Sequence, residues 1–157
     1  MKAAKIIFIT ALLLLVTACS SKPDLEPSIG EYELQREYPF GTDNSRYAAE
    51  YNKGKDVIFI EFWYANKMPD ADTGEQAFRQ RFFDENDKCR VHLLQCDTMQ
   101  DMTIADRPVI FAKLPNPDYN GFFSWCGRQH ISVSIPIWEN VTFSRQFVSN
   151  MLSNCEE

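Results

Sequence analysis

VIFIEFWY, residues 57–64, carries an apolar side chain at every position except Glu61. Side chains along a strand point alternately to opposite faces, so a strand with this sequence is apolar on both of its faces. A strand of that kind lies inside a sheet rather than at its edge. Residues 57–64 therefore predict a central β-strand.

The segments on the N-terminal side of this stretch also read as strands. Residues 45–51 and 56–65 flank Asn52-Lys53-Gly54-Lys55, whose asparagine and glycine favour a hairpin turn. Further upstream, apolar residues alternate between Tyr32 and Phe40, as expected for a half-buried strand.

Two helices are predicted on the C-terminal side. Thr73 with Gln76 forms a capping-box pattern that begins a helix over about 73–86, and the apolar spacing of residues 141–153 indicates an amphipathic helix. Strands are predicted at 89–96, 109–114, 121–126 and 129–137. This order of elements predicts an α+β fold in a single domain, with an antiparallel sheet of about 5–7 strands packed by two helices.

The N-terminus has the form of a secretory signal. Lys2 and Lys5 form a basic head, and an apolar run leads into Val16-Thr17-Ala18-Cys19. These last four residues resemble the lipobox of bacterial lipoproteins, which are cut before the cysteine and acylated on it. The alternative, a transmembrane helix, needs about 20 apolar residues, and roughly 13 precede Cys19. The resemblance implies a lipid anchor at Cys19.

The signal divides the chain into residues 1–18 as signal peptide, 19–30 as lipidated cysteine and tether, and 31–157 as the domain. The resemblance implies the outer membrane rather than the inner one, because Ser20 stands where inner-membrane lipoproteins tend to carry aspartate, and we expect the protein to face the periplasm. Loss of Lys2 and Lys5 leaves 14 basic residues against 22 acidic ones, a formal net charge of −8. An acidic chain without a basic patch disfavours nucleic acid as a partner.

Four cysteines remain once Cys19 carries lipid: Cys89, Cys96, Cys126 and Cys155. An even number in an oxidising compartment predicts two disulfides, with three possible connectivities. Of these, Cys96–Cys126 with Cys89–Cys155 is the pairing we favour, because the second bridge would hold the C-terminal tail.

Little in the sequence indicates catalysis. His92 and His130, the only histidines, both fall in predicted strands, and a Cys126–His130 thiol–imidazole pair competes with a disulfide for the same sulfur. Residues 70–75, DADTGE, only loosely follow a calcium loop, because the late bidentate glutamate is missing. We therefore expect no catalytic residues, no metal and no cofactor.

Acidic and aromatic side chains are the candidates for binding a partner. Asp70 and Asp72 precede the first predicted helix, Asp84 and Glu85 lie near its end, and aromatic residues make up 13% of the chain. The candidate partner-binding residues are Asp70, Asp72, Asp84, Glu85, Trp125 and Trp138.

Two functions fit a small acidic lipoprotein with these features. The first is a binding or inhibitor protein for a cationic toxin or hydrolase, similar to immunity lipoproteins in size, anchor, cysteine content and charge. The second is a structural or accessory lipoprotein of an envelope or secretion complex.

Overall fold

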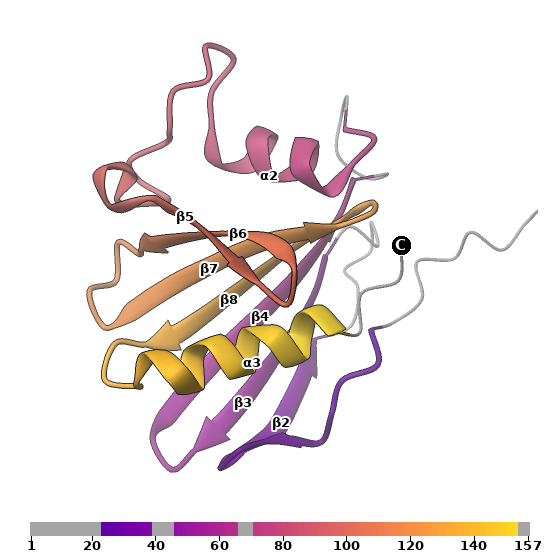
Figure 1. Ribbon diagram of the computed structural model, residues 1–157, viewed down its shortest axis with the longest axis vertical. Helices are drawn as coiled ribbons and strands as arrows, with labels where there is room; N and C mark the ends of the chain where they lie inside the picture. The colour runs from indigo at the N-terminus through magenta and orange to yellow at the C-terminus, as the bar shows by residue number, and fades with distance from the viewer. Residues whose placement is uncertain (1–22, 39–45, 66–70, 154–157) are drawn as a thin grey trace, which may run out of the picture.

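The computed structural model describes residues 23–38, 46–65 and 71–153. These residues form one antiparallel sheet of eight strands in the order β1-β2-β3-β4-β8-β7-β6-β5, and two α-helices among them pack on it (Figure 1). The strands are β1 (Ser28–Ile29), β2 (Tyr32–Tyr38), β3 (Arg46–Lys53), β4 (Asp56–Tyr64), β5 (Gln100–Ile104), β6 (Arg107–Lys113), β7 (Tyr119–Cys126) and β8 (Gln129–Pro136). The helices are α2 (Gly74–Phe82), α3 (Val141–Ser153) and a short 3₁₀ turn, η2 (Cys96–Thr98). The predicted α+β class is confirmed, and the predicted count of 5–7 strands is too low.

Strand β4 is central, as its sequence predicts. It lies between β3 and β8, and its alternate residues Ile58, Ile60 and Phe62 are buried on one face. Glu61 and Trp63 point to the other face, where α2 lies: the guanidinium of Arg81 in α2 pairs with Glu61 and covers the Trp63 ring. Both faces of this strand are therefore in contact with other parts of the chain.

The two helices cover opposite faces of the sheet. Phe122 and Phe123 are neighbours on β7 and so point to opposite sides. Phe122 belongs to the core cluster that includes Phe147 and the other buried residues of α3, whereas the ring of Phe123 contacts Phe78 and Phe82 of α2. We call these two sides the α3 face and the α2 face; Figure 1 shows α3 lying across the strands of its face.

The predicted first helix ends earlier than expected. Thr73 and Gln76 form the predicted capping box, but α2 ends at Phe82 rather than near residue 86. Phe83 is already extended and forms a β-bridge with Cys89, and the Asp84 carboxylate accepts hydrogen bonds from the backbone of the next turn. That turn replaces the last predicted helical turn.

Residues 89–96 do not form the predicted strand, and the favoured cysteine pairing is wrong. Cys89 and Cys96 are bonded to each other, with their Cα atoms 6.0 Å apart, and close a compact loop that packs on the α2-face core. His92, predicted in a strand, is exposed in this loop. Cys126 is disulfide-bonded as well, and Cys155 lies outside the described residues.

Strands β1 and β5 are absent from the predicted set. The β5–β6 hairpin turns at Ala105 and Asp106, which both have positive φ angles (52° and 59°) without a glycine to mark the turn. β1 lies in the predicted tether: Ile29 is buried, and Leu25 packs against the α3-face core. The described part of the predicted tether therefore contacts the domain through β1 and Leu25.

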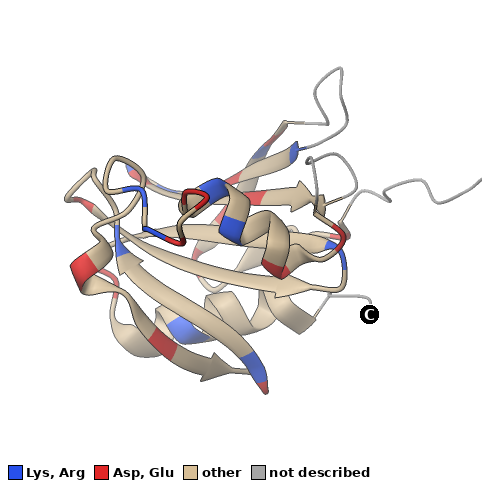
Figure 2. Ribbon diagram, turned by 90° about the horizontal axis from the view of Figure 1, so that it is seen from above, with Lys and Arg blue, Asp and Glu red and all other residues tan. Residues whose placement is uncertain are grey.

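Residues 1–22, including the predicted signal peptide and Cys19, lie outside the described residues. In the part of the chain that the structure describes, no helix has the length and apolar character to cross a membrane. Lys and Arg residues are dispersed among Asp and Glu residues along the described strands and helices (Figure 2).

Candidate functional site

A shallow groove of about 440 Å³ lies where the β5–β6 hairpin meets Trp125 of β7. We call it the Trp125 groove. It is lined by Asp101, Met102, Thr103, Asp106, Pro108, Val109, Ile110 and Trp125.

The sheet register explains why these side chains meet. Asp101 pairs with Ile110, and Ile110 pairs with Phe123, whose ring contacts α2. Asp101 and Ile110 therefore point to the α2 face. Trp125 is two residues beyond Phe123 on the same face, where its ring packs 5.7 Å from that of Phe78 in α2. The helix thus supports one wall of the groove, and the hairpin forms the other.

The groove combines an apolar surface with carboxylates that have no cationic partner among the described residues. Asp101 and Asp106 are exposed, and neither side chain forms an ion pair or hydrogen bond within the described part of the chain. Trp125 is half-buried, so one part of its ring packs in the core while another borders the groove. An aromatic surface beside unpaired carboxylates is suited to a Lys or Arg side chain with its aliphatic stem.

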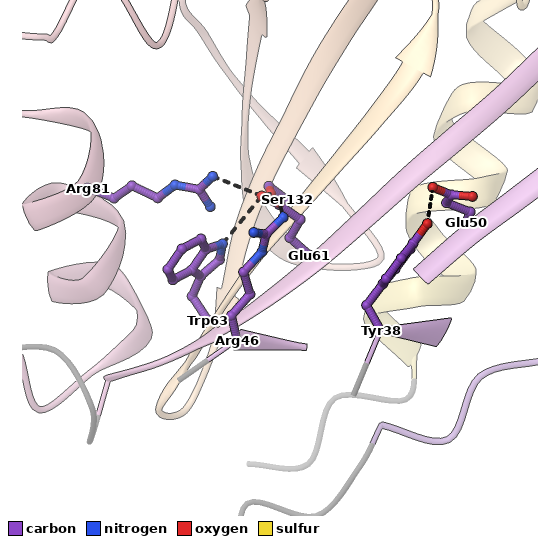
Figure 3. A network of polar contacts seen from close by, with 7 residues as sticks. All are labelled: Tyr38, Arg46, Glu50, Glu61, Trp63, Arg81 and Ser132. Atoms are coloured by element: carbon purple, nitrogen blue, oxygen red, sulfur yellow. Dashed lines mark hydrogen bonds and ion pairs between the residues drawn. The ribbon is translucent and has the colours of Figure 1, made fainter. Parts of the chain in front are cut away.

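A polar network holds α2 on the sheet next to this groove (Figure 3). Arg81 of α2 donates to Glu61 of β4 at 2.8 Å, and Arg46 of β3 pairs with the same carboxylate. The centroid of the Trp63 ring is 4.2 Å from the guanidinium carbon of Arg81 and 5.3 Å from that of Arg46. The Ser132 hydroxyl donates weakly to Glu61. The same face carries a separate Tyr38–Glu50 hydrogen bond of 2.6 Å.

The electrostatics of Glu61 follow from this arrangement. Burial acts to raise its pKa, but the charge and hydrogen bond of Arg81, together with the charge of Arg46, outweigh burial and hold the pKa below 4.5. Glu61 is therefore ionised at neutral pH, and its pair with Arg81 is satisfied where the helix meets the sheet.

His130 of β8 lies beneath α2 and is fully buried. Its ring contacts Phe78, Phe82 and Phe123, and neither ring nitrogen has a hydrogen-bond partner among the described residues. Burial, and secondly the nearby charge of Arg81, lower its pKa well below 6.5. His130 is thus a neutral core side chain, on the opposite side of the sheet from Cys126.

The burial of His130 predicts a pH-dependent stability. The unfolded chain binds a proton on this ring below about pH 6.5, but the folded chain resists doing so, so acidification favours unfolding by at most about 1.4 kcal/mol per pH unit. We expect the melting temperature to fall between pH 7 and pH 5, and His130→Leu to flatten this slope. The contribution of Glu61 is lost only below pH 4.5, outside this window.

Thermal unfolding at half-unit pH steps measures the slope, and His92→Gln is the matched control because His92 is the only other histidine and is exposed. An unchanged slope in His130→Leu would contradict the assignment.

The structure places the predicted partner-binding residues in three regions. Trp125 lies in the groove; Asp72 lies just before α2, and Asp84 and Glu85 lie just after it, all three exposed. Trp138 follows the far end of β8, because Trp125 pairs with His130 near the start of that strand. Asp70 lies outside the described residues. The structure therefore does not bring these six residues together into one site.

Sequence reasoning missed Asp101 and Asp106. A two-residue Ala-Asp turn between short apolar runs was the available signal, and it is weak without glycine or asparagine. In the described part of the chain no group of three or more His, Cys, Asp or Glu side chains is placed to hold a metal ion. No protein-family model, curated protein or solved structure matches this chain.

Proposed function

We propose that this protein is a lipid-anchored binding and inhibitor protein of the cell envelope, of the immunity type, which neutralises a cationic toxin or hydrolase in the periplasm. The observation that carries the proposal is the Trp125 groove, in which Asp101 and Asp106 lie beside an aromatic wall without an ion-pair partner in the described part of the chain. The anchor at Cys19 and its place in the outer membrane rest on the lipobox resemblance and on Ser20.

The chemistry of the groove suits a basic protein segment. Trp125 offers a large, partly buried ring of the kind that anchors protein interfaces, and the carboxylates would meet Lys or Arg side chains at its rim. Rim charges chiefly raise the association rate and are screened by salt. Binding should therefore weaken as ionic strength rises.

The position of the groove is compatible with an anchored protein. The chain enters the described domain along β1, at one edge of the sheet, whereas β5 forms the opposite edge. Seven strand spacings separate these edges, roughly 34 Å along the sheet. A short tether at the β1 edge thus leaves the groove accessible to a soluble partner.

The test is capture of a basic envelope or secreted protein by the full-length lipoprotein in detergent, at low and at high salt. Asp101→Asn/Asp106→Asn should weaken binding of the captured protein by about 10-fold, as expected for the loss of two exposed charge pairs. Glu33→Gln/Asp118→Asn is the matched control: it makes the same change in net charge at two exposed positions outside the groove and should leave binding within about twofold. Equal loss in both double variants would contradict a role for the groove.

A second candidate is the accessory lipoprotein. Ile137, Trp138 and Val141, in and after the β8–α3 connection, are 50%, 56% and 71% exposed, and large exposed apolar side chains close together in sequence are typical of protein contacts. Capture of a multi-subunit envelope complex that is lost in Trp138→Ala, but kept in the groove variant, would favour this function over the first.

A further inference from the structure

Among the described residues, strand β5 is an open edge of the sheet. It is the last strand in the order, its five residues pair with β6 without a register shift, and it contains neither proline nor lysine. The opposite edge differs: β1 has two residues, and β2 next to it has a register shift between Leu34 and Arg36. Proteins commonly protect edge strands by shortness, bulges, proline or charged side chains, and the only one of these features in β5 is the carboxylate of Asp101.

The pairing of Thr103 with Pro108 shows which backbone groups of β5 point outward. Residues facing each other in an antiparallel pair alternate between hydrogen-bonded and non-hydrogen-bonded pairs, and proline has no N–H to donate to a bonded pair. The Pro108 carbonyl accepts a hydrogen bond from the Ser124 hydroxyl of β7 at 2.7 Å, so it points away from β5. Thr103–Pro108 is therefore a non-hydrogen-bonded pair.

The same alternation makes Asp101–Ile110 a non-hydrogen-bonded pair as well. The N–H and C=O groups of Asp101 and Thr103 thus point away from β6, toward the open edge. Within the described residues none of these four groups has a hydrogen-bond partner, and both residues are exposed. Four backbone groups are therefore free to pair with another strand.

We propose that β5 accepts an extended basic segment of the protein partner as an additional antiparallel strand of the sheet. This deepens the proposed function and rests on it for the partner. The backbone of the added strand would bond with Asp101 and Thr103, and its basic side chains on the α2 face would meet the Asp101 carboxylate and reach into the Trp125 groove.

The carboxylates near β5 favour a basic strand as the occupant of this edge. Asp97 and Asp106 lie beyond the two ends of β5 and Asp101 lies within it, and all three are exposed. Two copies of the chain pairing through β5 would place these carboxylates against each other, which is unfavourable across strands. A strand with Lys or Arg at alternate positions instead pairs opposite charges along the edge.

The probe is an acetylated, amidated hexapeptide of alternating Lys and Val, with a Glu-Val peptide for comparison, added to the full-length chain in detergent. Amide hydrogen exchange should slow at Asp101 and Thr103 on binding of the Lys-Val peptide by about 10-fold or more, whereas Met102, in the hydrogen-bonded pair with Val109, should change little. The Glu-Val peptide should produce neither binding nor protection.

Thr103→Pro removes one outward N–H at a position where the ladder to β6 does not need it, while Thr103→Val keeps that N–H and serves as the matched control. Because the Thr103 side chain also lines the Trp125 groove, the two variants are compared with each other: Thr103→Pro should bind the Lys-Val peptide about 10-fold or more weakly than Thr103→Val.

The outcomes separate the two proposals. Binding of the Lys-Val peptide without protection at Asp101 and Thr103, and undiminished in Thr103→Pro, would overturn strand addition and leave the groove as a cation site. Absence of binding by both the Lys-Val peptide and any basic envelope protein would overturn the proposed function together with strand addition. If, without peptide, protection from amide hydrogen exchange at β5 grows with the concentration of the protein, the edge pairs with a second copy of this chain. That result would overturn the proposal of a basic partner strand.

Discussion

Glu61→Ala is expected to lower the free energy of unfolding by about 3 kcal/mol, the lower end of the range for breaking a buried ion pair. The side chains of Glu61 and Arg81 are 16% and 23% exposed, so removal of the carboxylate leaves a guanidinium with little access to water. One nitrogen of that guanidinium, Nη1, already lacks a partner among the described residues. Thermal unfolding at pH 7 should show a melting temperature lower by roughly 10 °C.

Two comparisons make this expectation specific to the network. Glu50→Ala removes a carboxylate from the same face of the sheet, where Glu50 accepts a single hydrogen bond from Tyr38, and should cost less than about 1 kcal/mol. Adding Arg81→Met to Glu61→Ala removes the guanidinium charge that Glu61→Ala leaves without its partner. The double variant should therefore recover part of the lost free energy of unfolding. If Glu61→Ala melts within 2 °C of the parent chain, the network does not stabilise the contact of α2 with the sheet.

Cys19→Ser is expected to abolish acylation and to remove the protein from the outer membrane. Two or more acyl chains hold a protein on a bilayer durably, whereas this variant has no sulfur to modify. Metabolic labelling with a fatty acid and membrane fractionation measure the two effects. Less than about a tenth of the parent label should remain.

Ser20→Asp is the matched comparison for the anchor, because it keeps the cysteine and changes the following residue to the one typical of inner-membrane lipoproteins. It should retain the acyl label and move the protein to the inner membrane. Acyl-labelled Cys19→Ser protein in the outer membrane would show that Cys19 is not the attachment site.

Several elements could be predicted because their determinants are local. The nearly unbroken apolar run of residues 57–64, the capping box at Thr73 and Gln76, and the apolar spacing of residues 141–153 all lead to elements seen in the structure. The strand predicted at 89–96 is absent because a disulfide and a turn organise that segment. The spacing of apolar residues indicates neither a disulfide nor this turn. The Cys89–Cys96 pairing itself was one of three that the cysteine count allowed.

Of the candidate site, only Trp125 was anticipated. In the sequence nothing distinguishes Asp101 and Asp106 from other surface residues. They become part of the candidate site because the β5–β6 hairpin lies beside β7. Asp72 and Trp138 were equally plausible from composition, but they lie at separate places on the fold.

What the sequence determined by itself is the α+β class, the central position of β4 and the expectation of a lipid anchor, because each depends on the identity and spacing of neighbouring residues. Tertiary structure decided the rest: the placement of α2 and α3 on opposite faces, the Glu61–Arg81 pair, the Trp125 groove and the open edge of β5. These features join residues far apart in the chain. Their formation depends on strand order and register, which are set by how the whole core packs and not by any local pattern.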